Sequence, residues 1–283
     1  MRYRAVLAAF LAMCLTFLTA CGGSDLSASD RLTYDQLKSL SYDDIVGTGL
    51  AAKCPQVPGD ASDAIALDGG QSFTLGSLCI EPSEYFVKEE PKTKRGEAEF
   101  APAQSLTRIT ATLDQVFGPL GFNDEGKITF TEAGGIDFAA ITVRLASGEQ
   151  FPFLFTTKGL VATADNAGGA LAPDVTLSGE YVVPSYRTSN FLDPKARGLT
   201  AGYETAVALP SSGDADEIER ENVKSFDVGE GHIEFTISKV DAFTGEVAGL
   251  FEAVQTSDTD MGSKEPADIK IRGVFYGRVD SAV

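Results

Sequence analysis

The chain has 283 residues and a formal net charge of −18 at pH 7, with 41 acidic and 23 basic side chains. So acidic a chain repels nucleic acid and anionic lipid, which excludes both as partners. One histidine and no tryptophan are present. A zinc site of several imidazoles is therefore impossible, and a Ser-His-Asp triad would have to use His232. His232 opens a predicted strand after a Gly-Glu-Gly turn, so we interpret it as a structural or surface residue.

The chain begins with a secretion signal in residues 1–20. Arg2 and Arg4 precede an apolar run over residues 5–18, which is too short to span a bilayer comfortably. The run LTACGGS at 18–24 matches a bacterial lipobox, which predicts a lipid on Cys21; a plain signal peptide is the alternative. Acyl chains on Cys21 would anchor the protein at a membrane surface, and residues 21–31 read as a flexible tether.

The other cysteines are Cys14, which leaves with the signal, Cys54 and Cys79. An exported protein meets an oxidising or permissive compartment, so Cys54 and Cys79 are expected to form a disulfide. On the chain-entropy estimate that bond would add about 3–4 kcal/mol of stability. Two buried thiols without a bond are the alternative.

Two related phrases follow the tether, LTYDQL at 32–37 and LSYDDI at 40–45. Thr33 and Ser41 are suitable N-caps, so each phrase predicts a short helix. Segment 215–224 (ADEIERENVK) is a further helix candidate.

Strand patterns dominate the rest of the chain. Segments rich in Ile, Val, Phe and Thr, most of them alternating, are joined by Asn, Asp and Gly turns. Pro152 interrupts one of them and predicts an edge strand or a bulge. The predicted strands are residues 105–113, 127–132, 136–145, 150–158, 175–183, 232–240, 246–254 and 268–279.

About eight strands at meander spacing predict an all-β fold, an antiparallel sheet closed into a barrel; a two-sheet sandwich is the alternative. We expect one barrel domain over residues 32–283, with a contact loop at 84–104 and a head insertion at 184–230. The contact loop holds Lys88, Lys92, Lys94 and Arg95 within eight residues. It is either a partner surface or a solvated turn.

The segment 182–210 has neither a strand period nor a helix period. It places aromatic and basic side chains on a loop stiffened by proline and glycine, which is typical of a surface that presses against a partner. An ordinary long hairpin excursion is the alternative. Further on, the acidic stretch from Asp258 to Glu265 could ligate calcium or relay protons, although its spacing alone favours a polar turn between strands.

Taken together, the phrases of this chain resemble the manganese-stabilising protein family, the large extrinsic subunit of photosystem II, over nearly all residues from about 32 onward. The phrases that carry the resemblance are SYDDIVGTGLAAKCP (41–55), LCIEP (78–82), YFVKEEPKTKRGEAEF (85–100), VPSYRTSNFLDPKARGLTAGY (183–203), VDAFTGEVAGLFEAVQTSDTDMG (240–262) and KEPADIKIRGVFY (264–276).

The resemblance implies a non-enzymatic β-barrel on the lumenal face of photosystem II. Such a subunit caps the manganese–calcium cluster without binding a cofactor of its own, and it helps shape water and proton channels. It implies partners among the reaction-centre, inner-antenna and other extrinsic subunits. It also implies the Cys54–Cys79 disulfide.

The resemblance further assigns roles to loop residues. The contact-loop residues are Lys88, Glu89, Glu90, Lys92, Lys94 and Arg95. The head-loop residues are Tyr186, Arg187, Phe191, Asp193, Lys195 and Arg197. The candidates for a proton network are Asp258 and Asp260.

Two features depart from the family pattern: the lipobox at Cys21 and the additional phrase LTYDQL. A lipid anchor would help to hold the subunit if the photosystem faced a periplasm rather than a sealed thylakoid lumen. The alternative functions are a lipid-anchored barrel that holds a small ligand and a hydrolase that uses His232.

Overall fold

The computed structural model describes residues 31–68, 70–89, 98–107, 110–184, 228–258 and 266–281. Predictions that fall on the signal, the tether, the tip of the contact loop, most of the head insertion and residues 259–265 lie outside these ranges. In the described part, no helix is long and apolar enough to cross a membrane.

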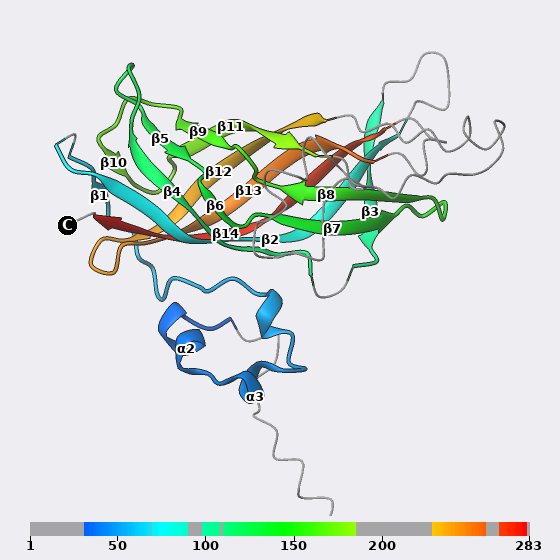
Figure 1. Cartoon of the computed structure of the whole chain (residues 1–283), viewed down its shortest axis with the longest axis horizontal. Helices are drawn as coiled ribbons and strands as arrows, with labels where there is room; N and C mark the ends of the chain where they lie inside the picture. Colours follow the sequence, from blue (N-terminus) through cyan, green and yellow to red (C-terminus); the bar gives the residue numbers. More distant parts are fainter. Residues whose placement is uncertain are drawn as a thin grey trace, which may run out of the picture.

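A segment with three short helical turns precedes the first strands and lies against one wall of the sheet (Figure 1). We call residues 31–57 the strap. It contains α2 (Tyr34–Ser39), α3 (Tyr42–Ile45) and the 3₁₀ turn η1 (Leu50–Ala52). Thr33 caps α2 and Ser41 caps α3, as the sequence predicts. Neither α-helix has a buried residue, so contacts with the barrel, not helix propensity, must hold the strap in place.

The remaining elements are strands. They are β1 (Ile65–Ala66), β2 (Phe73–Glu89), β3 (Glu99–Ser105), β4 (Leu113–Phe122), β5 (Ile128–Thr131), β6 (Gly134–Ile136), β7 (Phe138–Arg144), β8 (Gln150–Thr156), β9 (Val161–Ala164), β10 (Ala170–Leu171), β11 (Thr176–Val183), β12 (Gly229–Asp241), β13 (Glu246–Thr256) and β14 (Asp268–Ser281).

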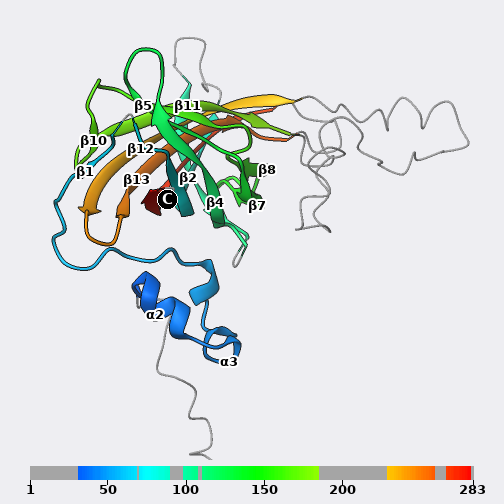
Figure 2. The same cartoon turned by 60° about the vertical axis from the view of Figure 1, so that its left-hand side comes forward.

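Eight of these strands close into an antiparallel barrel in the order β4-β5-β9-β11-β12-β13-β14-β2 (Figure 2). The first half of β2 closes it by pairing with β4, from Phe73 opposite Leu120 to Ile80 opposite Leu113. This pairing contains two register shifts. Ser77 in β2 and Gln115 in β4 have positive φ angles, so the closing seam is the irregular part of the wall.

The second half of β2 leaves the barrel wall and pairs with β3, which continues into β7 and β8. This extension forms a flap at one end of the barrel, and β8 is its edge strand. Pro152 lies in β8, opposite Thr142 of β7. The prediction of an edge strand at Pro152 is therefore confirmed, and it follows from the missing N–H of proline.

Inward side chains fill the barrel. Phe235 lies edge-on against Phe275 with ring centroids 5.1 Å apart, and Phe155 stacks on Phe251 at 5.8 Å. One cavity among the inward side chains, lined by Phe235 and Phe275 among others, measures about 30 Å³. Ligand pockets measure about 300–1,000 Å³, so this cavity is not a ligand chamber.

The fold class agrees with the sequence, but one predicted strand is wrong. The described residues between β3 and β4, 106–107 and 110–112, form no strand, whereas the β-branched pattern predicts a strand over 105–113. Here the chain must cross from the flap to the barrel, and the N–H of Leu106 bonds the carbonyl of Thr142 as it does so. Strands also reach into the expected contact loop, because β2 ends at Glu89 and β3 begins at Glu99.

Glycines in β4 offer a test of the packing near the seam. A Cβ added at Gly118 would lie 1.8 Å from the carbonyl oxygen of Thr131, whereas one at Gly121 would meet nothing within 4 Å. Gly118→Ala should therefore lower the free energy of unfolding by about 1–3 kcal/mol or more. Denaturant unfolding followed by circular dichroism measures this. Gly121→Ala is the matched control in the same strand, and equal stability of the two variants would contradict the packing argument.

Candidate docking site

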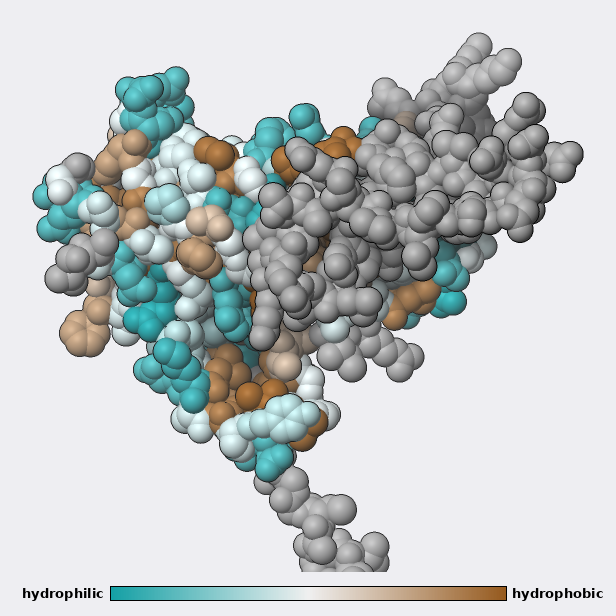
Figure 3. Space-filling model, in the orientation of Figure 1, coloured by the Kyte–Doolittle hydropathy of each residue, from teal (hydrophilic) through white to brown (hydrophobic). Residues whose placement is uncertain are grey.

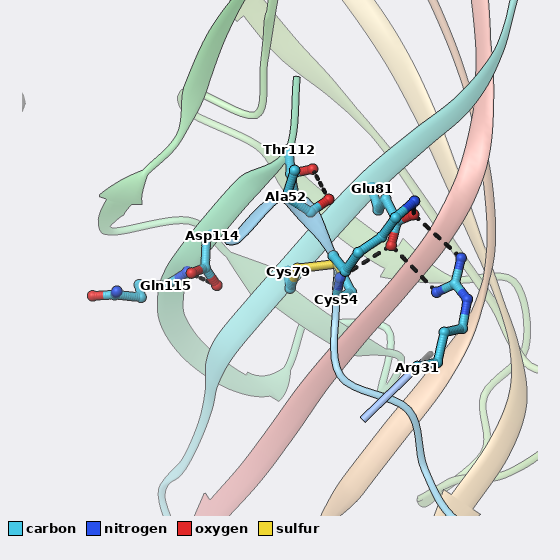
Figure 4. The surroundings of a disulfide bond; sticks show 9 residues. Arg31, Ala52, Cys54, Cys79, Glu81, Thr112, Asp114 and Gln115 are labelled. Carbon is cyan, nitrogen blue, oxygen red and sulfur yellow. Dashed lines mark hydrogen bonds and ion pairs between the residues drawn. A yellow bond between two sulfur atoms is a disulfide. The ribbon is translucent and has the colours of Figure 1, made fainter. Parts of the chain in front are cut away.

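Glu81 of β2 is the carboxylate that fastens the strap to the barrel (Figure 4). Its side chain is only 4% exposed. Arg31 donates to both of its oxygens at 3.2 Å, Lys53 Nζ lies 2.7 Å from Oε1, and the backbone N–H of Cys54 donates to Oε2 at 3.0 Å. A buried carboxylate is tolerated only when it is paired and hydrogen-bonded in this way.

A disulfide between Cys54 and Cys79 joins the strap to β2 beside this carboxylate, with Cα atoms 5.5 Å apart (Figure 4). Nearby, the hydroxyl of Thr112 donates to the carbonyl of Ala52 at 2.8 Å. The covalent bond and the Glu81 cluster therefore hold the end of the strap near Cys54, and Arg31 brings the first residue of the strap to the same carboxylate.

Tyr34 of α2 rests on a group that we call the aromatic seat, made of Ser77, Tyr276 and Arg278. The Tyr34 ring stacks on Tyr276 with centroids 6.0 Å apart, and its hydroxyl lies 3.4 Å from Ser77 Oγ. The Arg278 guanidinium lies 4.9 Å from the ring centroid. Hydrogen bonds from Lys38 and Ser77 lower the pKa of Tyr34, while burial and the bond to Glu246 raise that of Tyr276.

Strand registers bring three connections to one rim of the barrel. Val183 of β11 pairs with Gly229 of β12 where the head insertion leaves and returns. Thr256 of β13 pairs with Asp268 of β14 at the acidic turn, and Ile269 pairs with Val87 near the end of β2. Glu89 pairs with Glu99 where the contact loop begins and ends. The head insertion, the acidic turn and the contact loop therefore all start at this rim, on the right in Figure 1.

At the described base of the contact loop, ion pairs connect β14 to its two neighbours, β2 and β13. Lys88 Nζ lies 2.8 Å from Asp268 Oδ2, across β2 and β14. Glu252 receives both Lys270 at 3.1 Å and Arg272 at 2.6 Å. Partial burial opposes charge on Glu252, but the hydrogen bonds from Arg272 and Lys270 outweigh it and lower its pKa.

Aromatic rings lie under the same two cations. Lys270 lies 4.7 Å from the ring centroid of Phe100, and Arg272 lies 5.5 Å from that of Phe86. These rings come from β3 and β2, the strands that carry the contact loop. The cations are therefore held in place close to the rim.

The predicted site residues divide into those that the structure describes and those that it does not. Lys88 and Glu89 close β2, and Asp258 follows β13, where its N–H donates to the carbonyl of Pro152 at 2.9 Å. The predicted residues outside the described ranges are Cys21, Glu90, Lys92, Lys94, Arg95, Tyr186, Arg187, Phe191, Asp193, Lys195, Arg197 and Asp260.

His232 lies on the outer wall of the barrel, on β12. Its Nδ1 is 2.7 Å from Glu180 Oε1, and its Nε2 is 3.5 Å from Glu234 Oε1. The side chain is 43% exposed. These contacts are those of a surface ion pair and agree with the interpretation of His232 as a surface residue.

Sequence reasoning missed a buried charged cluster at the base of the β7–β8 hairpin. Asp137 precedes β7, Lys158 follows β8, and Glu132 follows β5. Lys158 Nζ lies 2.8 Å from Asp137 Oδ2 and 3.6 Å from Glu132 Oε1. Gly159 N–H donates to Glu132 Oε2 at 2.9 Å. One lysine thus pairs with two carboxylates and fixes where the hairpin leaves and rejoins the barrel.

The sequence holds only a weak signal for this cluster. Its residues stand at the ends of apolar strands, where exposed charges are also common. Burial raises the pKa of Glu132, and the neighbouring Asp137 raises it further, against the opposing effect of Gly159 and Lys158. Among the described residues no group of three or more His, Cys, Asp and Glu side chains is arranged to hold a metal ion.

The comparisons with known proteins agree with the fold. A family described as manganese-stabilising protein / photosystem II polypeptide matches residues 38–279. The chain belongs to the manganese-stabilising protein family. Photosystem II extrinsic protein O of Synechococcus elongatus is 55% identical over 282 residues, which is 100% of this chain and 99% of that protein.

Other relatives support the same family. Photosystem II extrinsic protein O of a Nostoc species is 50% identical, over 99% of this chain and 100% of that protein. Oxygen-evolving enhancer protein 1 of Chattonella marina is 49% identical over 90% of this chain and 81% of that protein. Members of this family are structural, extrinsic subunits of photosystem II, associated peripherally with its lumenal side. They shield a cluster that core subunits hold, rather than binding a cofactor themselves.

The buried cluster predicts a pH dependence of stability. The pKa of Glu132 is raised on folding, so the folded state binds more protons than the unfolded state above about pH 4.5, the ordinary value for this group. The contribution of Glu132 to stability therefore falls as pH rises from about 4.5 to its raised pKa. Glu132→Gln should gain stability relative to the parent across that window and show no gain below it.

Denaturant unfolding of the parent and the variant at several pH values measures this difference. Glu125→Gln is the control for removal of a carboxylate, because Glu125 is 72% exposed. A Glu132→Gln difference that stays flat, or that favours the parent as pH rises, would be evidence against a raised pKa.

Proposed function

We propose that this subunit docks over the oxygen-evolving manganese–calcium cluster with the rim that carries the head loop, the acidic turn and the contact loop. The observation that supports this is the strand register, which starts these three connections at one end of the barrel. The connections belong to strands far apart in the sequence, and a single face can carry all of them because β14 pairs directly with β2.

The charge of this face indicates which kind of partner it fits. The chain as a whole is strongly acidic, yet Lys88, Lys92, Lys94 and Arg95 gather in the contact loop. Arg187, Lys195 and Arg197 gather in the head loop. Basic loops on an acidic body fit core subunits with acidic lumenal surfaces, and complementary charges set orientation and association rate. Each exposed pair contributes only about 0–1 kcal/mol, so affinity depends on the whole face.

In this proposal Tyr186 and Phe191 of the head loop are the buried anchors, and the partners are reaction-centre and inner-antenna subunits with other extrinsic subunits. The docked barrel excludes bulk solvent from the cluster, which limits loss of its ions. Asp258 and Asp260 line part of a path for water and protons.

The alternative, a barrel that holds a small ligand, has less support. Ligand pockets measure about 300–1,000 Å³. The cavity inside this barrel measures about 30 Å³. Docking through the loops on the rim is therefore better supported than binding of a ligand in this cavity, which has no room for one.

Removal of the head-loop cations tests the docking face. Arg187→Ala, Lys195→Ala and Arg197→Ala together should weaken binding to photosystem II cores stripped of extrinsic subunits by about tenfold or more, since three charge pairs are lost. Oxygen evolution at low chloride, with protein added back, gives the functional readout. Circular dichroism should be unchanged.

The matched control keeps the charges, with Arg187→Lys, Lys195→Arg and Arg197→Lys. It should bind much more tightly than the alanine variant if charge sets the docking. Equal binding by the parent and the alanine variant would show that the head loop is not the contact. If the parent itself neither binds nor restores oxygen evolution, the proposed function is wrong.

We also propose that Cys21 carries a lipid that tethers the subunit to the membrane, since the LTACGGS run matches a lipobox. Mass spectrometry of the mature protein should show an N-terminal Cys21 with acyl chains. Cys21→Ser should release the protein from washed membranes. An unmodified N-terminus downstream of Cys21 would contradict the anchor and leave the docking proposal intact.

A further inference from the structure

The strap carries the same phrase twice, and both copies fold in the same way. Residues 32–37 and 40–45 share Leu, a hydroxyl residue, Tyr and Asp in the same order. At α2 the backbone N–H of Thr33 donates to the Gln36 side chain at 2.9 Å. At α3 the backbone N–H of Ser41 donates to the Asp44 side chain at 2.9 Å. The local structure therefore presents Tyr34 and Tyr42 from equivalent positions, one residue after the cap.

The barrel uses only the first copy. Tyr34 lies on the aromatic seat, stacked on Tyr276 and beside Arg278. Tyr42 is 78% exposed, and Val46, one turn later, is 53% exposed. Figure 3 shows hydrophobic side chains gathered on the strap, in the lower part of the view. Tyr42 is so exposed that packing does not stabilise it, whereas Tyr34, the equivalent tyrosine of the first copy, is packed against the barrel.

The two copies differ most at the positions where the first copy makes its specific contacts. Arg31 donates to both oxygens of Glu81, and the matching residue of the second copy is Ser39. Lys38 lies 4.6 Å from the Tyr34 ring centroid, and the matching residue is Val46. The second copy thus has the tyrosine but lacks the cation that reaches the buried carboxylate.

We infer that the two copies are alternative ligands for the aromatic seat, and that the Arg31–Glu81 pair selects the first. In the second arrangement α3 replaces α2, and Tyr42 stacks on Tyr276. This inference does not depend on the docking proposal. It assigns the second copy, residues 40–45, a role as a weaker ligand for the barrel wall.

Chain geometry permits the exchange without breaking the disulfide. Cys54 stays bonded to Cys79 in both arrangements, and Tyr34 and Tyr276 pack in the same buried cluster as Cys54. Tyr34 lies 20 positions before Cys54, and Tyr42 lies 12 positions before it. A 12-residue segment reaches up to about 40 Å when extended, which is ample for a loop whose two ends share one cluster.

The electrostatics at Glu81 determine the preference. In either arrangement Glu81 keeps Lys53 and the N–H of Cys54. Only the first arrangement adds the two bonds from Arg31. Bidentate contacts of arginine with carboxylate are strong and directional, so the first arrangement dominates in the parent.

The test combines substitutions in the two copies. The first-copy variant carries Arg31→Ser and Tyr34→Ala, which removes the selecting pair and the seated ring. Nitration of Tyr42 by tetranitromethane, followed by mass spectrometry, reports its exposure. Tyr42 should react about 2- to 10-fold more slowly in the first-copy variant than in the parent, the range expected for one stacked aromatic pair. Amides of residues 41–46 should exchange more slowly by a similar factor.

The substitution Tyr42→Ala, made in both backgrounds, tests whether the slowed exchange of the strap depends on Tyr42. In the parent background Tyr42→Ala should leave hydrogen exchange of the strap unchanged, because Tyr42 is exposed there. In the first-copy variant the same substitution should abolish the slowed exchange of residues 41–46. Arg31→Ser alone should give an intermediate nitration rate, and a native circular dichroism spectrum shows in each case that the barrel is folded.

The proposal fails if Tyr42 is nitrated at the same rate in the parent and in the first-copy variant. It also fails if Tyr42→Ala has no effect on exchange in either background. Those outcomes would mean that the second copy never occupies the seat.

Discussion

The structure depends on one long strand, β2, which pairs with different partners along its length. Its first half closes the barrel against β4, its second half carries β3 and the flap, and β14 pairs with it throughout. The strand also supplies Cys79 and Glu81, which hold the strap. Barrel closure, the flap, the contact loop and the N-terminal strap therefore share one backbone segment, and a shift of its register would move all of them.

Two buried charged clusters stabilise the parts that the hydrophobic core does not reach. Glu81 binds the strap through Arg31 and Lys53, and Lys158 binds the base of the β7–β8 hairpin through Glu132 and Asp137. Both lie where a segment outside the barrel meets its wall. Apolar packing is non-directional, whereas paired charges in a buried site fix a particular geometry, although removing one partner would leave the other uncompensated.

These supports explain how an acidic barrel can serve as a docking subunit. The interior is filled, so recognition has to come from the surface. Antiparallel pairing from β11 to β14, and of β14 with β2, places the ends of these strands on one rim. Lys88, Lys270 and Arg272 are held there by Asp268 and Glu252. Cations that are already positioned lose less conformational entropy on binding than mobile ones. The rest of the face would come from the loops that the rim carries.

The sequence by itself determined the fold class, the helix caps, the family and the strands β5, β7, β8 and β11 to β14, because alternation, capping residues and long ordered phrases are local properties of the chain. It also placed Pro152 on an edge strand. It predicted no strand over most of β2, β3, β4 or β9. It did not determine that β2 runs unbroken from Phe73 to Glu89, because Gly76, Pro82 and Ser83 weaken the pattern where bulges occur. Only the tertiary structure decided that residues 106–107 and 110–112 form no strand, that Glu132 and Asp137 share Lys158, and that Tyr34, not Tyr42, is seated. Each of these depends on a contact between residues distant in sequence, and local patterns carry no information about which distant partner a side chain meets.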